Sequence, residues 1–220
     1  MGIQIQGNGG TIADVDGTVF RALRTTSRPT DYTTLGHYRL STTVSLVVTQ
    51  AANGTLLSFR WGDATRFAAI ERIKLGCLQT SAATATIFPV FEAIMARAFT
   101  ASDTVGTALT LTTNSFKKRT TMGTTLVTDI RKSAVAAGLT AGTRTLDADS
   151  ILRVSTQQTI TTPNQVYYTA EWIADTASGM HPEVLALNEG LLIRGPSIIF
   201  GAAGTANLDV EIDWKEVAVY

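Results

Sequence analysis

Two closely spaced carboxylates are the first residues in this sequence that could do chemistry. Asp14 and Asp16 lie in the stretch "TIADVDGTVF", residues 11–20, where Gly17 follows the second of them. A pair of carboxylates can supply a nucleophile and a general acid or base. An Asp-Gly step is equally ordinary turn chemistry. Whether the pair belongs to a catalytic site or to a turn therefore depends on the strands and helices predicted around it.

The stretch resembles the opening motif of the phosphatases and hydrolases of the haloacid dehalogenase superfamily. The resemblance implies that Asp14 attacks a phosphate and that Asp16 handles the proton. Such a site needs a buried, nearly continuous apolar strand before the pair, and strands that alternate with helices. The preceding residues, "GNGGTIA", cannot form that strand, and no acidic cluster follows Lys117 and Lys118. We therefore interpret Asp16-Gly17 as a turn and predict that the chain is not an enzyme.

The other residues with catalytic or metal-binding side chains are isolated. His37 and His181 are the only histidines, Cys77 is the only cysteine, and no "GxSxG" motif is present. These positions give no zinc pattern and no hydrolytic triad. Asp147 and Asp149 supply two carboxylates beside a Gly/Thr turn, which is weak support for a cation site. We predict structural histidines, a buried Cys77 that acts as a small hydrophobic residue, and no cofactor or metal.

Composition argues against several classes of function. Of 220 residues, 18 are basic and 18 acidic, so the formal net charge is zero. Charged residues make up 16%, against about 25% in an average soluble domain. The chain therefore has no electrostatic footprint for nucleic acid or an anionic membrane, and no signal peptide or apolar run of about 18 residues is visible. Low charge with abundant threonine is typical of a sheet face that packs against another protein.

From Tyr38 onward, alternating apolar and polar residues predict β-strands. We expect residues 38–50 and 54–62 to form a hairpin across Asn53-Gly54. Further strands are expected in residues 67–80, 83–99, 107–113, 124–135, 144–161, 164–175, 190–201 and 206–220, and one or two helical turns in residues 182–190. About eight to ten strands predict an all-β fold, an antiparallel β-sandwich that is jelly-roll-like. It would form a single domain, residues 36–220, after an extended N-terminal arm, residues 1–35.

Two segments are candidate contact surfaces. The arm is rich in Gly and Thr, with short apolar pieces that a partner could order. The only basic run is "FKKR", which is usual for a solvated loop but could contact an acidic patch on a partner. We predict the following interface residues: Ile3, Ile5, Val19, Phe20, Phe116, Lys117, Lys118 and Arg119.

The three tryptophans leave a second kind of binding open. Trp61, Trp172 and Trp214 lie inside expected strands, so we predict that they pack in the core or in an interface. Jelly rolls also host carbohydrate sites, so glycan binding stays an alternative.

Three stretches carry a second resemblance. They are "ARAFTASDTVGTALTLTTNSFKKRTTMGTTLVTDIR", "AGLTAGTRTLDAD" and "HPEVLALNEGLLIRGP", supported upstream by "LGHYRLS" and "LSFRWGDATRFAAIERIKL". Over about residues 36–215 they resemble virion structural proteins of tailed bacteriophages. The resemblance implies a non-enzymatic component of the virion, assembled in the host cytoplasm.

Within that group, the resemblance implies a capsid decoration (cement) protein. Such a protein is a β-sandwich that forms trimers or other homo-oligomers and binds the major capsid protein or other virion proteins, without cofactor, nucleic acid or membrane. Two alternatives stay open: a tail, fibre or head–tail protein with receptor or glycan binding, and a single-jelly-roll coat protein.

Overall fold

The computed structural model describes residues 36–160, 167–174, 180–197 and 203–218. The described residues all belong to one compact unit, Tyr32–Tyr220. The expected arm, residues 1–35, lies outside them, as do Asp14, Asp16, Ile3, Ile5, Val19 and Phe20. The interface prediction for the arm and the proposed boundary at residue 36 therefore stay predictions.

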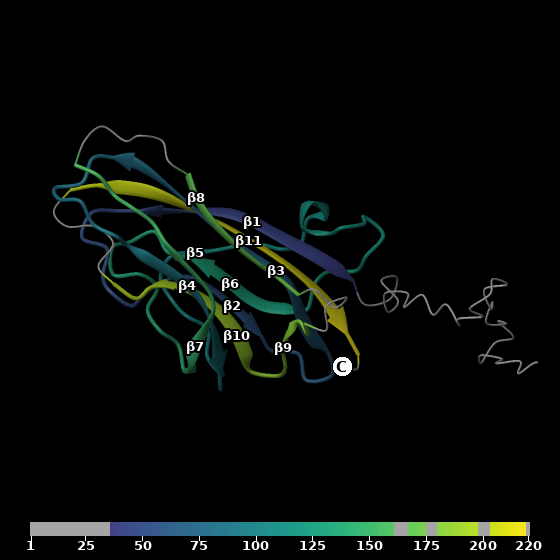
Figure 1. The fold of residues 1–220 in the computed structure, drawn as a ribbon. Helices are drawn as coiled ribbons and strands as arrows, with labels where there is room; N and C mark the ends of the chain where they lie inside the picture. The colour runs from purple at the N-terminus through teal and green to yellow at the C-terminus, as the bar shows by residue number, and fades with distance from the viewer. Residues whose placement is uncertain (1–35, 161–166, 175–179, 198–202, 219–220) are drawn as a thin grey trace, which may run out of the picture. The chain divides into compact units, whose positions relative to one another are not determined.

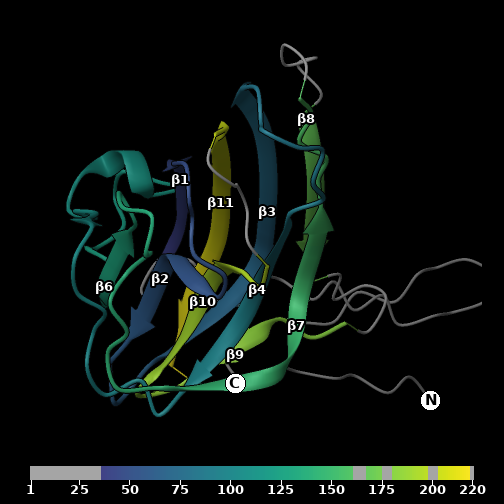
Figure 2. The ribbon, with the colours of Figure 1, turned by 90° about the vertical axis from the view of Figure 1, so that its left-hand side faces the viewer.

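Two antiparallel sheets pack against each other (Figures 1 and 2). The first sheet has the order β1-β11-β3-β8, with strands His37–Leu46, Thr205–Val217, Phe67–Ser81 and Tyr167–Ile173, and β9, Glu183–Leu185, also pairs with β3. The second sheet has the order β5-β6-β2-β10-β4-β7, with strands Thr107–Ala108, Val127–Lys132, Gly54–Trp61, Glu189–Gly195, Val90–Arg97 and Thr145–Ser155. The predicted all-β sandwich is confirmed.

The strand order is that of a jelly roll. Without the short β5 and β9 and the added β6, the chain changes sheet at each of the eight remaining strands, except between β4 and β7, which are neighbours in the second sheet. Counted in chain order, the first sheet then runs first-eighth-third-sixth and the second runs second-seventh-fourth-fifth. This nesting of early and late strands is the double Greek key of the jelly roll, as the sequence predicts.

The core lies between the sheets and is best seen along β11. Its even-numbered residues from Ala206 to Trp214 are buried, while the odd-numbered residues from Thr205 to Lys215 are partly exposed. Trp214 stacks on Tyr38 with ring centroids 5.6 Å apart and meets the edge of Phe59 at 5.2 Å. Trp61 is also fully buried, and its indole N–H donates to the Arg66 carbonyl at 3.0 Å. The packing role predicted for these two tryptophans is confirmed.

The predicted hairpin between residues 38–50 and 54–62 is wrong. β1 pairs with β11, whereas β2 pairs with β10 and β6 in the other sheet. The turn itself is present, because Asn53 has φ 59° and the Gly54 N–H donates to the Ala51 carbonyl. An Asn-Gly turn fixes a local reversal only, and here it passes the chain from one sheet to the other.

The helical turns expected in residues 182–190 are also absent. Glu183–Leu185 forms β9, which pairs with Ala68–Ile70 of β3, and Leu185 is fully buried in the core. β3 is 15 residues long and extends past β8, so its backbone offers β9 a partner that the local sequence does not reveal. Tertiary pairing outweighs helix propensity at this position.

Loops cover the outer side of the second sheet. Ile94, Ala96, Phe99 and Leu192 form a second buried cluster there. Beside it, Asp103 and Arg144 form a buried ion pair. The pair joins the β4–β5 connection to the β6–β7 connection. In the central strands β2, β10 and β4, both faces are largely removed from water.

Candidate functional site

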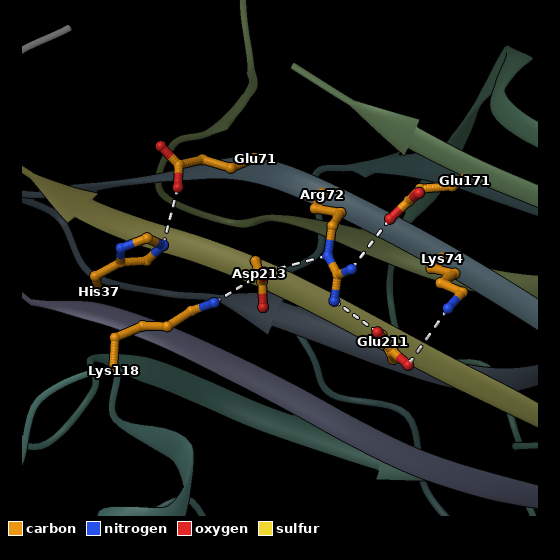
Figure 3. Close-up of polar contacts among 8 residues, drawn as sticks. All are labelled: His37, Glu71, Arg72, Lys74, Lys118, Glu171, Glu211 and Asp213. Carbon is orange, nitrogen blue, oxygen red and sulfur yellow. Dashed lines mark hydrogen bonds and ion pairs between the residues drawn. The ribbon is translucent and has the colours of Figure 1, made fainter. Parts of the chain in front are cut away.

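The outer side of the first sheet carries a network of ion pairs. We call it the polar face; it consists of the outward side chains of β1, β11, β3 and β8. Its centre is Arg72 on β3, which contacts carboxylates of two neighbouring strands (Figure 3). The Arg72 guanidinium lies 3.0 Å from Glu171 on β8, and 2.6 Å from Glu211 and 3.2 Å from Asp213 on β11.

The strand register explains why these charges meet. Arg72 is paired across the sheet with Asp213 on one side and Ile173 on the other. Glu211 and Glu171 each lie two residues from these partners, on the same face, so all three carboxylates are within reach of the guanidinium. Burial opposes the charge of Arg72, yet the nearby carboxylates of Asp213 and Glu211 raise its pKa above the usual value. The guanidinium therefore stays charged and holds three strands together.

A second group of charges surrounds Glu71. Its carboxylate lies 2.7 Å from Lys215 Nζ and 2.9 Å from His37 Nε2. Burial alone would raise the pKa of Glu71, but the hydrogen bonds and positive charge of His37 and Lys215 lower it to about 2. Lys118 and Lys74 add contacts to Asp213 at 3.0 Å and to Glu211 at 4.0 Å. Most charges on the polar face are thus matched by a neighbour of opposite sign.

A loop borders the polar face beside β1. We call residues 113–126 the bordering loop; it includes a 3-10 turn, Asn114–Phe116. The Lys118 N–H donates to the His37 carbonyl at 2.9 Å, and the Tyr38 hydroxyl donates to the Gly123 carbonyl at 3.1 Å. These bonds place the loop beside the first residues of β1, so that this part of the edge is shielded by the protein's own chain.

Glu216 on β11 holds the far end of the bordering loop. Its carboxylate accepts from the Thr125 hydroxyl at 2.6 Å and from the Leu126 N–H at 2.8 Å. Glu216 is only 3% exposed, and this burial raises its pKa to about 7 in spite of the two hydrogen bonds. The loop is therefore attached through a carboxyl group that titrates near neutral pH.

A groove of about 530 Å³ lies between the bordering loop and the polar face. Arg39, Ser41 and Arg72 line its sheet side, and Ser115 and Phe116 line its loop side. The groove combines guanidinium groups and an aromatic ring with two carboxylates, Glu211 and Asp213. It can accept a polar group or a short peptide segment by hydrogen bonding, and it has no nucleophile positioned beside a base.

The structure brings the predicted basic run to this groove. Phe116 packs partly buried against the core, Lys117 forms a β-bridge with Tyr38, and Lys118 is paired with Asp213. Arg119 is exposed. Part of the run thus stabilises the fold, and Arg119 is the residue whose charge is most open to a partner.

The isolated candidates from the sequence do not form a catalytic group among the described residues. Cys77 is buried, which confirms the prediction, and burial raises the pKa of its thiol to about 12. Asp147 pairs with Arg97 at 3.0 Å, while Asp149 and His181 are exposed. In the described part of the chain no three His, Cys, Asp or Glu side chains are grouped so that they could hold a metal ion.

Sequence reasoning missed one feature of this sheet, its edge at β8. Tyr167 and Ile173, at the two ends of the strand, are 47% and 51% exposed. Trp172 packs against the core, as predicted, and is partly buried. The strand sequence, "YYTAEWI", contains no Lys, Pro or Gly, the residues that commonly protect an edge. That absence is the signal that could have identified the edge.

Comparison with known proteins finds no family model, no curated protein and no solved structure that matches this chain. Within the described residues, no helix is long and apolar enough to cross a membrane.

Proposed function

We propose that this chain is a non-enzymatic structural protein of a tailed-bacteriophage virion, most specifically a capsid decoration protein. It binds the major capsid protein or another virion protein, forms a homo-oligomer, and stabilises the shell by adding buried contact area. It needs no cofactor, nucleic acid or membrane. The resemblance over about residues 36–215 supplies the virion context of the proposal.

The observation that carries the proposal is the pairing of charges on the polar face. Arg72 is fixed between Glu171, Glu211 and Asp213 at 2.6–3.2 Å. A face whose charges are already paired has little net field to attract a small charged ligand. It instead presents a fixed pattern of donors and acceptors, which suits register and specificity in a protein–protein contact.

Positive charge on the loop side of the groove would determine the orientation of a bound partner. Arg119 is exposed at the border of the polar face, and Lys117 lies beside it in the bordering loop. Both add positive charge at one side of an otherwise balanced surface. An acidic segment of a capsid protein would therefore be oriented toward the bordering loop.

Purified particles of a phage that encodes this chain test the proposal. We expect the chain in the particle fraction, and we expect particles that lack it to release DNA at a lower temperature. Arg119→Glu should weaken rebinding of the purified chain to such particles. Arg153→Glu is the matched control, because Arg153 is also exposed but lies on β7 in the other sheet. Absence of the chain from purified particles would refute the virion role.

The groove supports one alternative, glycan binding by a tail or fibre protein. An aromatic residue, Phe116, faces Arg39 and Arg72 across the groove, and such a set can stack on and hydrogen-bond a sugar. A glycan array would separate the two roles: specific hits that disappear with Phe116→Ala would support the tail protein. The same variant should leave particle rebinding unchanged in that case.

A further inference from the structure

β8 is an edge strand whose second side has no partner among the described strands. It pairs with Arg72–Leu78 of β3 on one side only and ends the first sheet (Figure 2). Its outward residues Tyr167, Thr169, Glu171 and Ile173 are all exposed. The unpaired backbone groups of such a strand are a template for another strand.

The edges at β1, β5 and β7 are protected to different degrees. The bordering loop covers the start of β1, at His37–Arg39, and further along Lys132 Nζ donates to the Thr43 carbonyl. β5 has only two residues, and β7 has two register shifts and carries Asp147, Asp149 and Arg153. Short length, irregular register and charge each disfavour pairing with another chain. β8 has seven residues in regular register, and its one charged side chain, Glu171, is already paired with Arg72.

We propose that β8 is the contact through which two copies of this chain associate, by antiparallel pairing of β8 with β8 of the partner copy about a two-fold axis at Ala170. The pairing would join the two β1-β11-β3-β8 sheets into one continuous sheet. Two-fold contacts of this kind use the same surface on both copies and are the commonest form of homo-oligomer.

The sequence of β8 is complementary to itself in this register. Centred on Ala170, exposed Tyr167 lies opposite Ile173 of the partner copy, an aromatic–β-branched pair that favours sheet formation. Thr169 lies opposite Glu171 of the partner copy, so no two like charges face each other. All seven residues of the strand are paired.

Neighbouring registers are worse. The inward side chains of both copies stay on the same face of the joined sheet only if the two-fold axis passes through a residue. The neighbouring registers to compare are therefore those with the axis at Thr169 or at Glu171. An axis at Glu171 places that carboxylate directly opposite its own copy, which is destabilising. An axis at Thr169 leaves Trp172 and Ile173 without a partner. The register at Ala170 is thus selected by charge and by the number of pairs.

The inward side of β8 supports the same arrangement. Tyr168 and Trp172 are cross-strand neighbours of the buried Cys77 and Ile73, yet both remain partly exposed. Both side chains thus keep part of their surface in water, although β7 of the second sheet lies beside β8. In the two-fold pair, Tyr168 lies opposite Trp172 of the partner copy, and this aromatic pair would bury part of that surface.

This contact does not depend on the virion role, since the chain can self-associate whether or not it binds a capsid. Light scattering of the full chain should give a mass of twice 23.4 kDa. Thr169→Glu places two symmetry-related Glu–Glu pairs in the contact and should raise the dimer dissociation constant about tenfold or more. Thr169→Lys adds a side chain of similar length and should preserve or tighten the dimer.

Thr169 is a suitable position for this comparison because it is exposed and lies opposite Gly76 in its own sheet. Either substitution therefore leaves the monomer fold intact. Equal effects of the two variants would overturn the proposal, as would a monomeric wild-type chain. A mass of three chains would overturn the two-fold pairing of β8 and would agree instead with the trimer implied by the phage resemblance.

A cysteine cross-link tests the register independently. Ala170→Cys would place two thiols opposite each other at the axis, within the Cα separation that a disulfide requires. The variant is made in a Cys77→Ala background, because Cys77 is a diagonal neighbour of Ala170 on the same inward face. Ser45→Cys, exposed on β1 at the other edge of the sheet, is the control. We expect a disulfide-linked dimer from Ala170→Cys alone; its absence, or equal cross-linking of the control, would overturn the register.

Discussion

Replacing Glu216 by glutamine should remove a pH dependence of stability. Glu216 is buried at the end of the bordering loop, and its pKa is raised from the usual 4.5 to about 7. Between these pH values the unfolded chain has lost the proton that the folded chain retains. The free energy of unfolding contributed by this group therefore falls as pH rises from about 4.5 to about 7.

The magnitude follows from the separation of the two pKa values. A difference of about 2.5, at about 1.4 kcal/mol for each pKa unit, corresponds to ~3 kcal/mol. Above pH 7 this cost is complete and no longer changes. Glutamine does not titrate, and its side-chain oxygen can still accept from the Thr125 hydroxyl and the Leu126 N–H. The variant should thus gain stability relative to wild type as pH rises from 5 to 8.

Urea unfolding followed by tryptophan fluorescence, at fixed protein concentration and at pH 5, 6, 7 and 8, measures this difference. Trp214 lies two residues from Glu216 and is fully buried, so it reports on the same region. Leu126→Ala is a useful control, because it alters the same loop without changing a titrating group. If wild type and Glu216→Gln show parallel stability curves across pH 5 to 8, the reasoning from burial is wrong.

Three further perturbations test other parts of the structure. Glu71 has a lowered pKa, so its contribution to stability is complete above about pH 4.5 and is lost as pH falls toward 2. Glu71→Gln should reduce this loss of unfolding free energy at acid pH by roughly 1–2 kcal/mol in urea unfolding. An unchanged loss in the variant would contradict the role of the ion pairs of Glu71. Gly76→Ala places a methyl group against the Tyr167 hydroxyl, which bonds Asp209 at 3.3 Å, and should cost about 1 kcal/mol in thermal unfolding. That cost should vanish in a Tyr167→Ala background, and its persistence would show that the clash lies elsewhere. Asp103→Asn leaves the charge of Arg144 buried without its partner and should cost about 3–5 kcal/mol in urea unfolding, whereas Asp149→Asn, at an exposed position, should change stability by less than about 0.5 kcal/mol.

The sequence carries enough information to predict the architecture because the signal for a strand is local. The alternation in β11 from Leu208 to Trp214 corresponds to its burial pattern residue by residue. The alternation of Ile73, Leu75 and Cys77 likewise predicts the second half of β3 as a strand and the inward position of Cys77. Each of these follows from the two-residue period of a strand with one buried face.

Which strands pair with each other depends on residues far apart in the sequence, and the sequence predictions fail at these pairings. Asn53-Gly54 specifies a turn, but whether the following strand joins the same sheet depends on β11, more than 140 residues away along the chain. Glu183–Leu185 is a strand because β3 extends beyond β8. The contact between Asp103 and Arg144 joins two loops and has no pattern in the sequence that would identify it.

The two edges of the first sheet show how function can arise from one fold without any catalytic group. At β1 the chain supplies its own cover, and Glu216 attaches that cover through hydrogen bonds to Thr125 and Leu126. At β8 the described chain supplies none, although the strand has seven residues of high β-propensity. An uncovered edge of this composition is stable in solution only if something pairs with it or if its exposure is brief. Since the polar face is held by its own ion pairs and the outer side of the second sheet is covered by loops, β8 is where a further strand completes the sandwich.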